Sequence, residues 1–304
     1  MVGEWRRLCA EGLVRSGVRL DALTTYKLGG TARWFAEGGD YAHLSALGDA
    51  GAGAGDVLVL GKGSNVIVSD EGYGGLVIRL VGDFLSIRHP DERVEAGGGV
   101  GLPRLARSAV GEGRLGLEFM VGIPGTVGGG VYQNAGCHGT EMVDVLEEVE
   151  VFDLHTGELT IVDPDTLCLR YRSSAVEPHH VITRSWFRFT PGEPAEGLEK
   201  IRAITRWRRI HQPGGTLNAG SVFKNPPGDA AGRLIDALGL KGMRIGDVSV
   251  SDKHANFFVA GADATAEDVR RLVTEVRVRV RAETGIELEP EVRFVGFSSE
   301  VAPA

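Results

Sequence analysis

Glycine-rich runs constrain this chain more than any other feature of its sequence. The stretch IPGTVGGG at residues 123–130 holds four glycines, and two more follow at positions 136 and 139. A backbone without side chains can approach a large anion closely enough for its N–H groups to donate hydrogen bonds. A bound diphosphate is the natural ligand for this run, although a single glycine pair more often only lets two strands pack closely.

A second glycine loop, GKGSN at residues 61–65, lies between the apolar segments 57–60 and 66–68. Short apolar segments of this kind are typical of buried strands. We therefore expect both loops at strand ends, where they can hold one ligand from two sides.

Length and charge limit the class of protein. The 304 residues, 42% of them hydrophobic, suffice for two or three compact units. The net charge of −8 argues against a nucleic-acid or acidic-membrane surface. The first residues lack the apolar core of a signal peptide or membrane anchor, so we expect a cytoplasmic protein. Three cysteines without metal or redox spacing fit reduced thiols.

Hydrophobic periodicity predicts the regular elements. Helical spacing marks residues 4–15, 41–50, 102–110 and 198–210. Thr265 and Asp268 form a capping box ahead of a longer helix, whose apolar stripe is Val269, Leu272, Val273, Val276 and Val280. Apolar and polar residues alternate on both sides of residues 155–157, which predicts a β-hairpin. The polar segment 191–197 is the best linker candidate, so we expect a domain boundary near it.

Familiar nucleotide and metal fingerprints do not occur. No glycine motif opens a helix with an acidic residue about 20 positions later, and the loop at 61–65 lacks the upstream glycine of a Walker motif. Only His179 and His180 are adjacent among the histidines, and no pair takes metal-ligand spacing with carboxylates. We therefore expect neither a Rossmann site nor a metal.

Three polar residues need an explanation. Arg172 follows an aromatic residue, Ser221 follows a glycine, and Glu291 lies in an apolar segment. Taken singly, they are best interpreted as a surface arginine, a turn hydroxyl and a paired carboxylate.

Six ordered motifs change that interpretation. They are TYKLGG at 25–30, GKGSN at 61–65, IPGTVGG at 123–129 with NAG at 134–136, YRSS at 171–174, AGSVFKNP at 219–226 and LEPEVR at 288–293. Through these motifs the chain resembles the UDP-N-acetylenolpyruvoylglucosamine reductase family over nearly its whole length.

The resemblance implies an α+β fold with an FAD-binding domain of the vanillyl-alcohol-oxidase (PCMH) type in two subdomains and a smaller α/β substrate domain. We place the first FAD subdomain at 1–82, joined by a C-terminal strand at 289–304, the second at 83–197 and the substrate domain at 198–288.

The resemblance also implies the roles of individual residues. Arg172, Ser221 and Glu291 take the catalytic positions. The cofactor-binding residues are Gly61, Lys62, Gly63, Ser64, Asn65, Pro124, Gly125, Thr126, Gly128, Gly129, Asn134, Ala135 and Gly136. The substrate-binding residues are Tyr171, Arg209, His211, Lys224 and Asn225.

The implied reaction uses FAD and NADPH to reduce UDP-N-acetylglucosamine enolpyruvate to UDP-N-acetylmuramate, a step of peptidoglycan precursor synthesis. Hydride reaches the enolpyruvyl methylene carbon, and Arg172 holds the substrate carboxylate as negative charge develops. We expect burial to raise the pKa of Glu291, so that it acts as an acid. Ser221 delivers the final proton, with water or Lys224 as a relay.

Two departures from the family pattern stand out. His211 precedes Gln-Pro where the family usually has lysine or arginine, so Arg208 or Arg209 can share the diphosphate contact. Only residues 190–197 occupy the place where one branch inserts a tyrosine-bearing loop, which is typical of the branch without it.

Two other functions stay open at this point. One is a sugar or alcohol oxidase on the same flavin fold. The other is a flavin-binding or nucleotide-sugar-binding homologue without turnover. In each case we expect a small-molecule ligand and a monomer, with no nucleic-acid or membrane partner.

Overall fold

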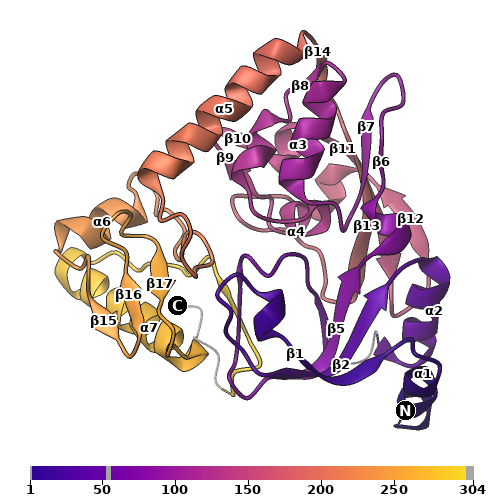
Figure 1. The fold of residues 1–304 in the computed structure, drawn as a ribbon, viewed down its shortest axis with the longest axis horizontal. Helices are drawn as coiled ribbons and strands as arrows, with labels where there is room; N and C mark the ends of the chain where they lie inside the picture. The colour runs from indigo at the N-terminus through magenta and orange to yellow at the C-terminus, as the bar shows by residue number, and fades with distance from the viewer. Residues whose placement is uncertain (1, 53–55, 299–304) are drawn as a thin grey trace. The chain divides into compact units, whose positions relative to one another are not determined.

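The computed structural model describes residues 2–52 and 56–298 (Figure 1). Its α-helices are α1 (Val2–Ala10), α2 (Tyr41–Asp49), α3 (Leu102–Gly111), α4 (Val127–Tyr132), α5 (Pro194–His211), α6 (Ala231–Ala237) and α7 (Ala266–Thr284). The described residues form two compact units. The first comprises 2–17, 33–52, 56–62 and 75–207, and the second comprises 18–32, 63–74 and 208–298.

The first unit is built around a five-stranded sheet in the order β12-β11-β13-β7-β6. These strands are β6 (Ile87–Arg88), β7 (Val94–Gly97), β11 (Leu146–Asp153), β12 (Leu159–Val162) and β13 (His180–Phe187). Helices α3 and α4 pack against this sheet, since Leu105, Val127 and Val149 share one buried core (Figure 1). The predicted hairpin is confirmed, because β11 pairs antiparallel with β12 from Val149 to Phe152.

A four-stranded sheet has the order β1-β2-β5-β3. Its strands are β1 (Arg15–Arg19), β2 (Thr31–Gly38), β5 (Tyr73–Leu80) and β3 (Val57–Val59). Strands β3 and β5 run parallel. In the first unit, Leu44 and Leu47 of α2 are fully buried against Ile78 of β5 and their neighbours.

Two short pairings complete the first unit. Strand β9 (Gly136–Cys137) pairs with β10 (Thr140–Glu141), and β14 (Thr190–Pro191) pairs with β8 (Arg114–Leu115). The segment 191–197, predicted as a linker, instead forms the end of β14 and the first turn of α5. That prediction was wrong because Gly192 packs so closely on Leu115 that an added Cβ would lie 2.5 Å from its Cδ1 atom.

The second unit combines a three-stranded sheet with α6 and α7. The sheet order is β15-β16-β17, from Arg244–Ile245, Val248–Val250 and Phe258–Ala260. The predicted apolar stripe of α7 is confirmed, with Val269, Leu272, Val273, Val276 and Val280 all fully buried. The predicted capping box is confirmed as well, because Thr265 and Asp268 exchange side-chain to backbone hydrogen bonds of 3.1 and 3.2 Å.

Segments far apart in sequence join within the second unit. Strand β4 (Val66–Val68) pairs in parallel with β18 (Arg293–Val295). The Asp70 carboxylate accepts hydrogen bonds of 3.0 and 3.1 Å from the amides of Ala266 and Glu267, the first two residues of α7. The C-terminal strand predicted at 289–304 is therefore observed at 293–295, and residues 299–304 lie outside the described residues.

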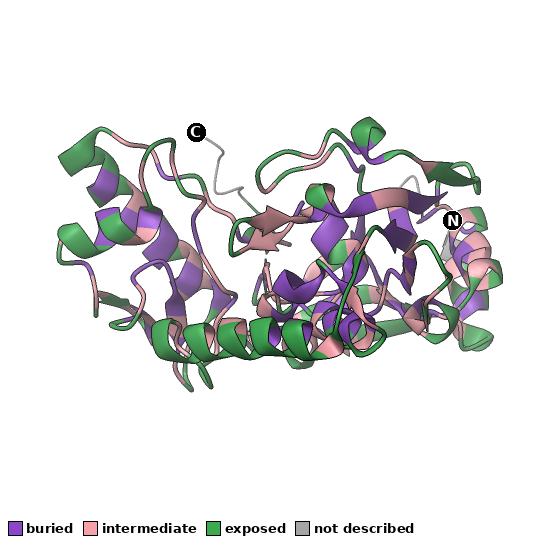
Figure 2. Ribbon diagram, turned by 90° about the horizontal axis from the view of Figure 1, so that it is seen from above, coloured by how far each residue is buried: buried purple, intermediate pink, exposed green. Residues whose placement is uncertain are grey.

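Helix α5 differs from its prediction in length and in exposure. It begins at Pro194, so the boundary predicted between 197 and 198 falls inside a continuous helix, and the three-domain division stays a prediction. Of its predicted apolar face, Ile201 is buried but Leu198 is 39% exposed. A long, mostly exposed helix is visible in Figure 2, which agrees with the few buried residues of α5.

Within residues 2–52 and 56–298, no helix is long and apolar enough to cross a membrane.

Candidate active site

The two glycine loops meet in the first unit. A Cβ atom added to Gly61 would lie 2.5 Å from the Thr126 hydroxyl oxygen. The loop that begins at Gly61 therefore contacts the N-cap residue of α4. Thr126 is also bridged to Gly101, which starts α3. The sequence prediction that the loops lie together is therefore confirmed for their first-unit residues.

The backbone N–H groups of these loops differ in their partners. Among the described residues, the N–H groups of 61–65 and of Gly125 and Thr126 donate no hydrogen bond to the protein. In contrast, Gly128 donates to the Gly98 carbonyl at 2.8 Å and Gly129 to the Thr126 hydroxyl at 3.4 Å. The amides left to donate to a bound anion are therefore those before α4, not those of the helix itself.

Close packing explains the later glycines of the run. A Cβ atom on Gly128 would lie 3.2 Å from the carbonyl oxygens of Gly98 and Ile182, so glycine lets α4 approach the sheet. Close packing thus accounts for Gly128, whereas ligand approach stays the prediction for the earlier part of the run.

Arg172 is held by a turn of the first unit. Its guanidinium forms an ion pair of 2.9 Å with Glu141 and donates to the carbonyls of Gly136 at 2.8 Å and Asn134 at 3.3 Å. Its backbone has φ 54°, an uncommon conformation for a residue with a Cβ atom. The ring of Tyr171 lies 4.8 Å from the guanidinium carbon. Arg172 is therefore a positioned, half-buried cation and not a free surface arginine.

Asn134 organises the same turn. It is 1% exposed, its amide nitrogen donates to Glu141 at 3.0 Å and to the Arg170 carbonyl at 3.1 Å, and its oxygen accepts from the Val143 amide at 3.0 Å. Because the side chain is occupied by the protein, it positions this turn, and the predicted cofactor contact of Asn134 stays a prediction.

Ser221 and Glu291 come together in the second unit. The Glu291 amide donates to the Val222 carbonyl at 2.8 Å, and the Lys224 amide donates to the Glu289 carbonyl at 2.9 Å. Ser221 is bridged on its other side to Phe257. The motifs at 219–226 and 288–293, distant in sequence, thus run antiparallel through an isolated bridge between Phe223 and Pro290, and the Glu291 backbone pairs with that of Val222, the residue after Ser221.

Asn256 fixes this arrangement and was not predicted. It is 3% exposed, its side-chain oxygen accepts from the Phe223 amide at 2.9 Å, and its nitrogen donates to the Phe223 carbonyl at 2.8 Å. A side chain that pairs with both backbone groups of one residue acts as a short piece of strand. Its sequence neighbours give no pattern that predicts this role.

The residues predicted to bind substrate differ in their contacts and in their exposure. Lys224 donates to the Glu289 carboxylate at 2.6 Å. Asn225 accepts from the Ala231 amide at 3.1 Å, which anchors the start of α6. His211 is exposed at the end of α5, and the carbonyl of Arg209 accepts from Lys253 at 2.7 Å. Tyr171, in the first unit, is 44% exposed.

A buried tyrosine anchors the motif at 25–30. Tyr26 is 1% exposed, and its hydroxyl donates to the Phe258 carbonyl at 2.9 Å. Burial raises the pKa of this hydroxyl above its usual range. The neighbouring Thr25 hydroxyl donates to the Asn218 carbonyl at 2.7 Å, which ties this motif to the serine segment.

Comparisons with known proteins identify the family. Residues 212–295 match the model of the UDP-N-acetylenolpyruvoylglucosamine reductase C-terminal domain, and residues 44–163 match an FAD binding domain. The UDP-N-acetylenolpyruvoylglucosamine reductase 2 of Symbiobacterium thermophilum is 42% identical over 96% of this chain and 95% of its own length. The reductase of Rubrobacter xylanophilus is 43% identical over 91% and 93%. This chain belongs to the UDP-N-acetylenolpyruvoylglucosamine reductase family.

A solved structure supports the same assignment for this reductase family member. The crystal structure of the UDP-N-acetylenolpyruvylglucosamine reductase from Thermus caldophilus superposes with a TM-score of 0.80 at 38% identity, covering 93% of this chain and 99% of the other. The predicted α+β fold with an FAD-binding domain is confirmed. The short connection from β13 through β14 to α5 also agrees with the predicted absence of an inserted loop.

The first-unit loops of this reductase fit a flavin dinucleotide. Its diphosphate needs several donors, and the amides at 61–62 and 125–126, which donate to no protein group, are the ones that would hold it where Gly61 lies against Thr126. Side chains larger than hydrogen at Gly61 would collide with Thr126 before any ligand entered. The cofactor-binding residues named from the sequence stay a prediction. The structure adds which backbone N–H groups would donate hydrogen bonds to the diphosphate.

Proposed function

We propose that this chain is an NADPH-dependent reductase that converts UDP-N-acetylglucosamine enolpyruvate to UDP-N-acetylmuramate for peptidoglycan precursor synthesis. Its reductase relatives match it from end to end at 42 and 43% identity, which supports the activity. The single structural observation that carries the proposal is the pairing of the serine segment with the glutamate segment. That pairing, through the Glu291 amide and the Val222 carbonyl, joins the backbones of the two segments, and we propose that the Ser221 hydroxyl and the Glu291 carboxyl group serve one site.

FAD, when bound, supplies the hydride that reduces the enolpyruvyl methylene carbon, after NADPH has reduced the flavin. The neighbouring substrate carbon and its carboxylate then take up negative charge. Every other requirement falls on the protein, which must hold that charge, place the substrate and provide one proton.

Arg172 is the group proposed to bind the substrate carboxylate. Its ion pair with Glu141 and its two carbonyl contacts fix the direction of the guanidinium before any ligand arrives. Preorganised cations of this kind stabilise developing negative charge more strongly than mobile ones, because they need no reorganisation during the reaction.

Ser221 is the proposed proton donor to carbon, and Glu291 its partner. A carboxyl group in its acid form can share a proton with the developing enolate, whereas a carboxylate would repel it. The predicted relay through Lys224 needs that side chain to leave Glu289, to which its ammonium donates at 2.6 Å. Water is therefore the simpler relay.

We further propose that the enzyme works as a cytoplasmic monomer on a soluble nucleotide sugar. Its net charge of −8 supports the absence of a nucleic-acid or acidic-membrane partner. His211, with Arg208 or Arg209, is proposed to face the UDP diphosphate.

The proposal is tested by following the flavin absorbance of purified protein. NADPH should bleach it without oxygen, and UDP-N-acetylglucosamine enolpyruvate should restore it within one turnover. A sugar or alcohol oxidase would instead be bleached by its alcohol substrate and restored by oxygen. A protein that binds flavin but is not restored by the enolpyruvyl sugar would contradict the proposed function.

A further inference from the structure

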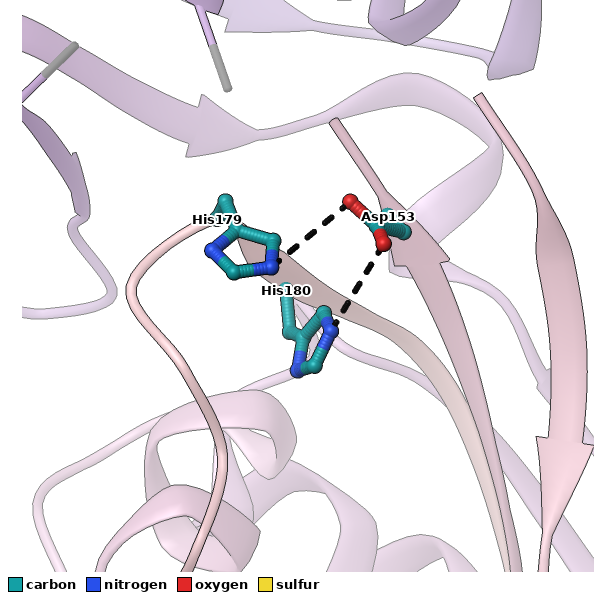
Figure 3. A group of neighbouring side chains, drawn as sticks. All are labelled: Asp153, His179 and His180. Carbon is teal, nitrogen blue, oxygen red and sulfur yellow. Dashed lines mark ion pairs between the residues drawn. The ribbon is translucent and has the colours of Figure 1, made fainter. Parts of the chain in front are cut away.

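The start of β13 brings together three side chains that the reductase reaction does not use. Asp153, the last residue of β11, pairs in register with His180, the first residue of β13. The Leu154 amide donates to the His179 carbonyl at 3.0 Å, which fixes the residue before the strand as well. Figure 3 shows the two imidazole rings turned toward the Asp153 carboxylate.

The three side chains present separate donor atoms to one point. His179 Nε2 lies 3.8 Å from Asp153 Oδ1, and His180 Nε2 lies 3.8 Å from Oδ2. All three ligand atoms lie within 4.8 Å of one another. Distances of 3.8 Å are too long for hydrogen bonds, but they are close to the spacing of two ligands on one ion, since zinc bonds of about 2.0–2.2 Å separate ligands by roughly 3.3–3.5 Å.

We propose that Asp153, His179 and His180 bind one divalent transition-metal ion of the zinc class. Two imidazoles and one carboxylate are a donor set that suits such ions, whereas magnesium and calcium prefer oxygen ligands throughout. The sequence led us to expect no metal because spacing alone cannot show that Asp153 reaches the histidines across the sheet.

The surroundings of the cluster orient the carboxylate and leave room for an ion. Asp153 Oδ1 accepts hydrogen bonds from the amides of His155 at 2.6 Å and Thr156 at 3.3 Å. The side chains of both histidines are 31% exposed and that of Asp153 is 22% exposed, so an ion can enter from solvent. The centroid of the His155 ring lies 6.0 Å from that of His179, outside the group of three ligand atoms, so the remaining positions on an ion are left to solvent.

One contact limits the strength of binding. His180 Nδ1 accepts a hydrogen bond of 3.3 Å from the Glu177 amide. Coordination of a metal through Nε2 places the ring proton on Nδ1, so the hydrogen bond from the Glu177 amide must break. The Nδ1–H group then faces an N–H donor and lacks the acceptor that usually supports a metal-bound histidine. Such supporting contacts are worth about 10–100-fold in metal affinity. The site should therefore bind zinc reversibly and not as a permanent structural centre.

The test is a calorimetric titration of ZnCl2 into purified, flavin-loaded protein that has been freed of metal with EDTA. Wild type should bind one zinc ion per chain and show a higher melting temperature with zinc. Asp153→Asn should weaken binding at least tenfold, by loss of the charged ligand, and the double variant His179→Ala/His180→Ala should lose the binding and the thermal shift.

His138→Ala is the matched control, because it removes an exposed histidine of the same unit that lies outside the cluster. It should bind zinc as wild type does. Absence of saturable binding to wild type, equal binding by the double variant, or an equal loss in the control would each overturn the proposal. If Asp153→Asn were unstable, the double variant and the control would still decide the matter.

Discussion

The guanidinium of Arg172 and the carboxylate of Glu141 form an ion pair of 2.9 Å in which both side chains are largely shielded from solvent. Glu141 also accepts from the Asn134 amide nitrogen at 3.0 Å. One carboxylate thus joins the arginine to the turn that follows the glycine run at 123–130. Because the Glu141 carboxylate accepts from both Arg172 and Asn134, we assign it a positioning role.

The first prediction concerns this role. Glu141→Ala should lower the turnover number about 10–100-fold, because misplacement of a charge-binding group by about 1 Å costs that much. Glu141→Gln should restore most of the loss, since its amide oxygen can still accept from Arg172. Flavin reduction by NADPH should stay normal in both variants. Steady-state kinetics with the enolpyruvyl sugar, together with the flavin bleaching rate, measure these effects; slower bleaching would place Glu141 in the flavin site.

A second prediction concerns the cofactor loops. A Cβ atom on Gly129 meets only the Thr126 hydroxyl, at 3.4 Å, so the protein has room for a larger side chain there. If the flavin diphosphate lies against this loop, Gly129→Val should yield mostly apoprotein, because the branched side chain occupies ligand space. The flavin content of the purified variant, from its absorbance, gives the answer.

Gly111→Val is the matched control for that variant. Gly111, the last residue of α3, is likewise an exposed helical glycine and has nothing within 4 Å of an added Cβ atom. It should retain stoichiometric FAD with little change in stability, since valine has a slightly higher helix propensity than glycine and meets nothing here. Full flavin content in Gly129→Val would remove Gly129 from the cofactor site.

The third prediction follows from the buried hydroxyl of Tyr26. Its pKa is raised in the folded protein by burial, whereas in the unfolded chain it titrates near 10. Stability from this group is therefore complete below about pH 10 and falls as the unfolded chain ionises at higher pH, by at most about 1.4 kcal/mol per pH unit. Urea unfolding at pH 8, 9.5 and 11 measures this loss.

Tyr26→Phe should remove that contribution and leave the Phe258 carbonyl without its donor, at a cost of about 1–3 kcal/mol at neutral pH. Tyr171→Phe, which changes an exposed ring, serves as the control and should keep the wild-type pH dependence. Part of the dependence will persist in every variant, because burial also raises the pKa of Tyr41. Equal slopes for Tyr26→Phe and wild type would contradict the assignment.

Periodic elements could be predicted from the sequence because their signals are local. The capping box of Thr265, the stripe of α7 and the hairpin between β11 and β12 each follow from residues a few positions apart. Helix α5 was predicted too short and too buried, since an apolar residue such as Leu198 does not reveal whether another element covers it.

The site was harder to predict because its geometry depends on pairings between distant segments. Arg172, Ser221 and Glu291 came from motif resemblance, but Glu141 and Asn256 needed coordinates. Each forms hydrogen bonds with a residue that is remote in sequence, and no rule based on sequence spacing predicts such a contact. The same limit hid the approach of Asp153 to His179 and His180.

The last prediction separates the two half-reactions at Ser221. Its hydroxyl is proposed to act only after hydride has reached the substrate, so NADPH should bleach the flavin of Ser221→Ala at a near-normal rate. Restoration of the flavin by the enolpyruvyl sugar should be slowed by the general-acid factor of roughly 10²–10⁴. The fold should tolerate the change, because the Val222 backbone, and not the serine side chain, makes the hydrogen bonds to Glu291 and Asn256 that hold this segment. Stopped-flow absorbance reports each half separately. Equal slowing of both halves would mean that Ser221 shapes the flavin site, and normal rates in both would reduce it to a turn hydroxyl beside Glu291.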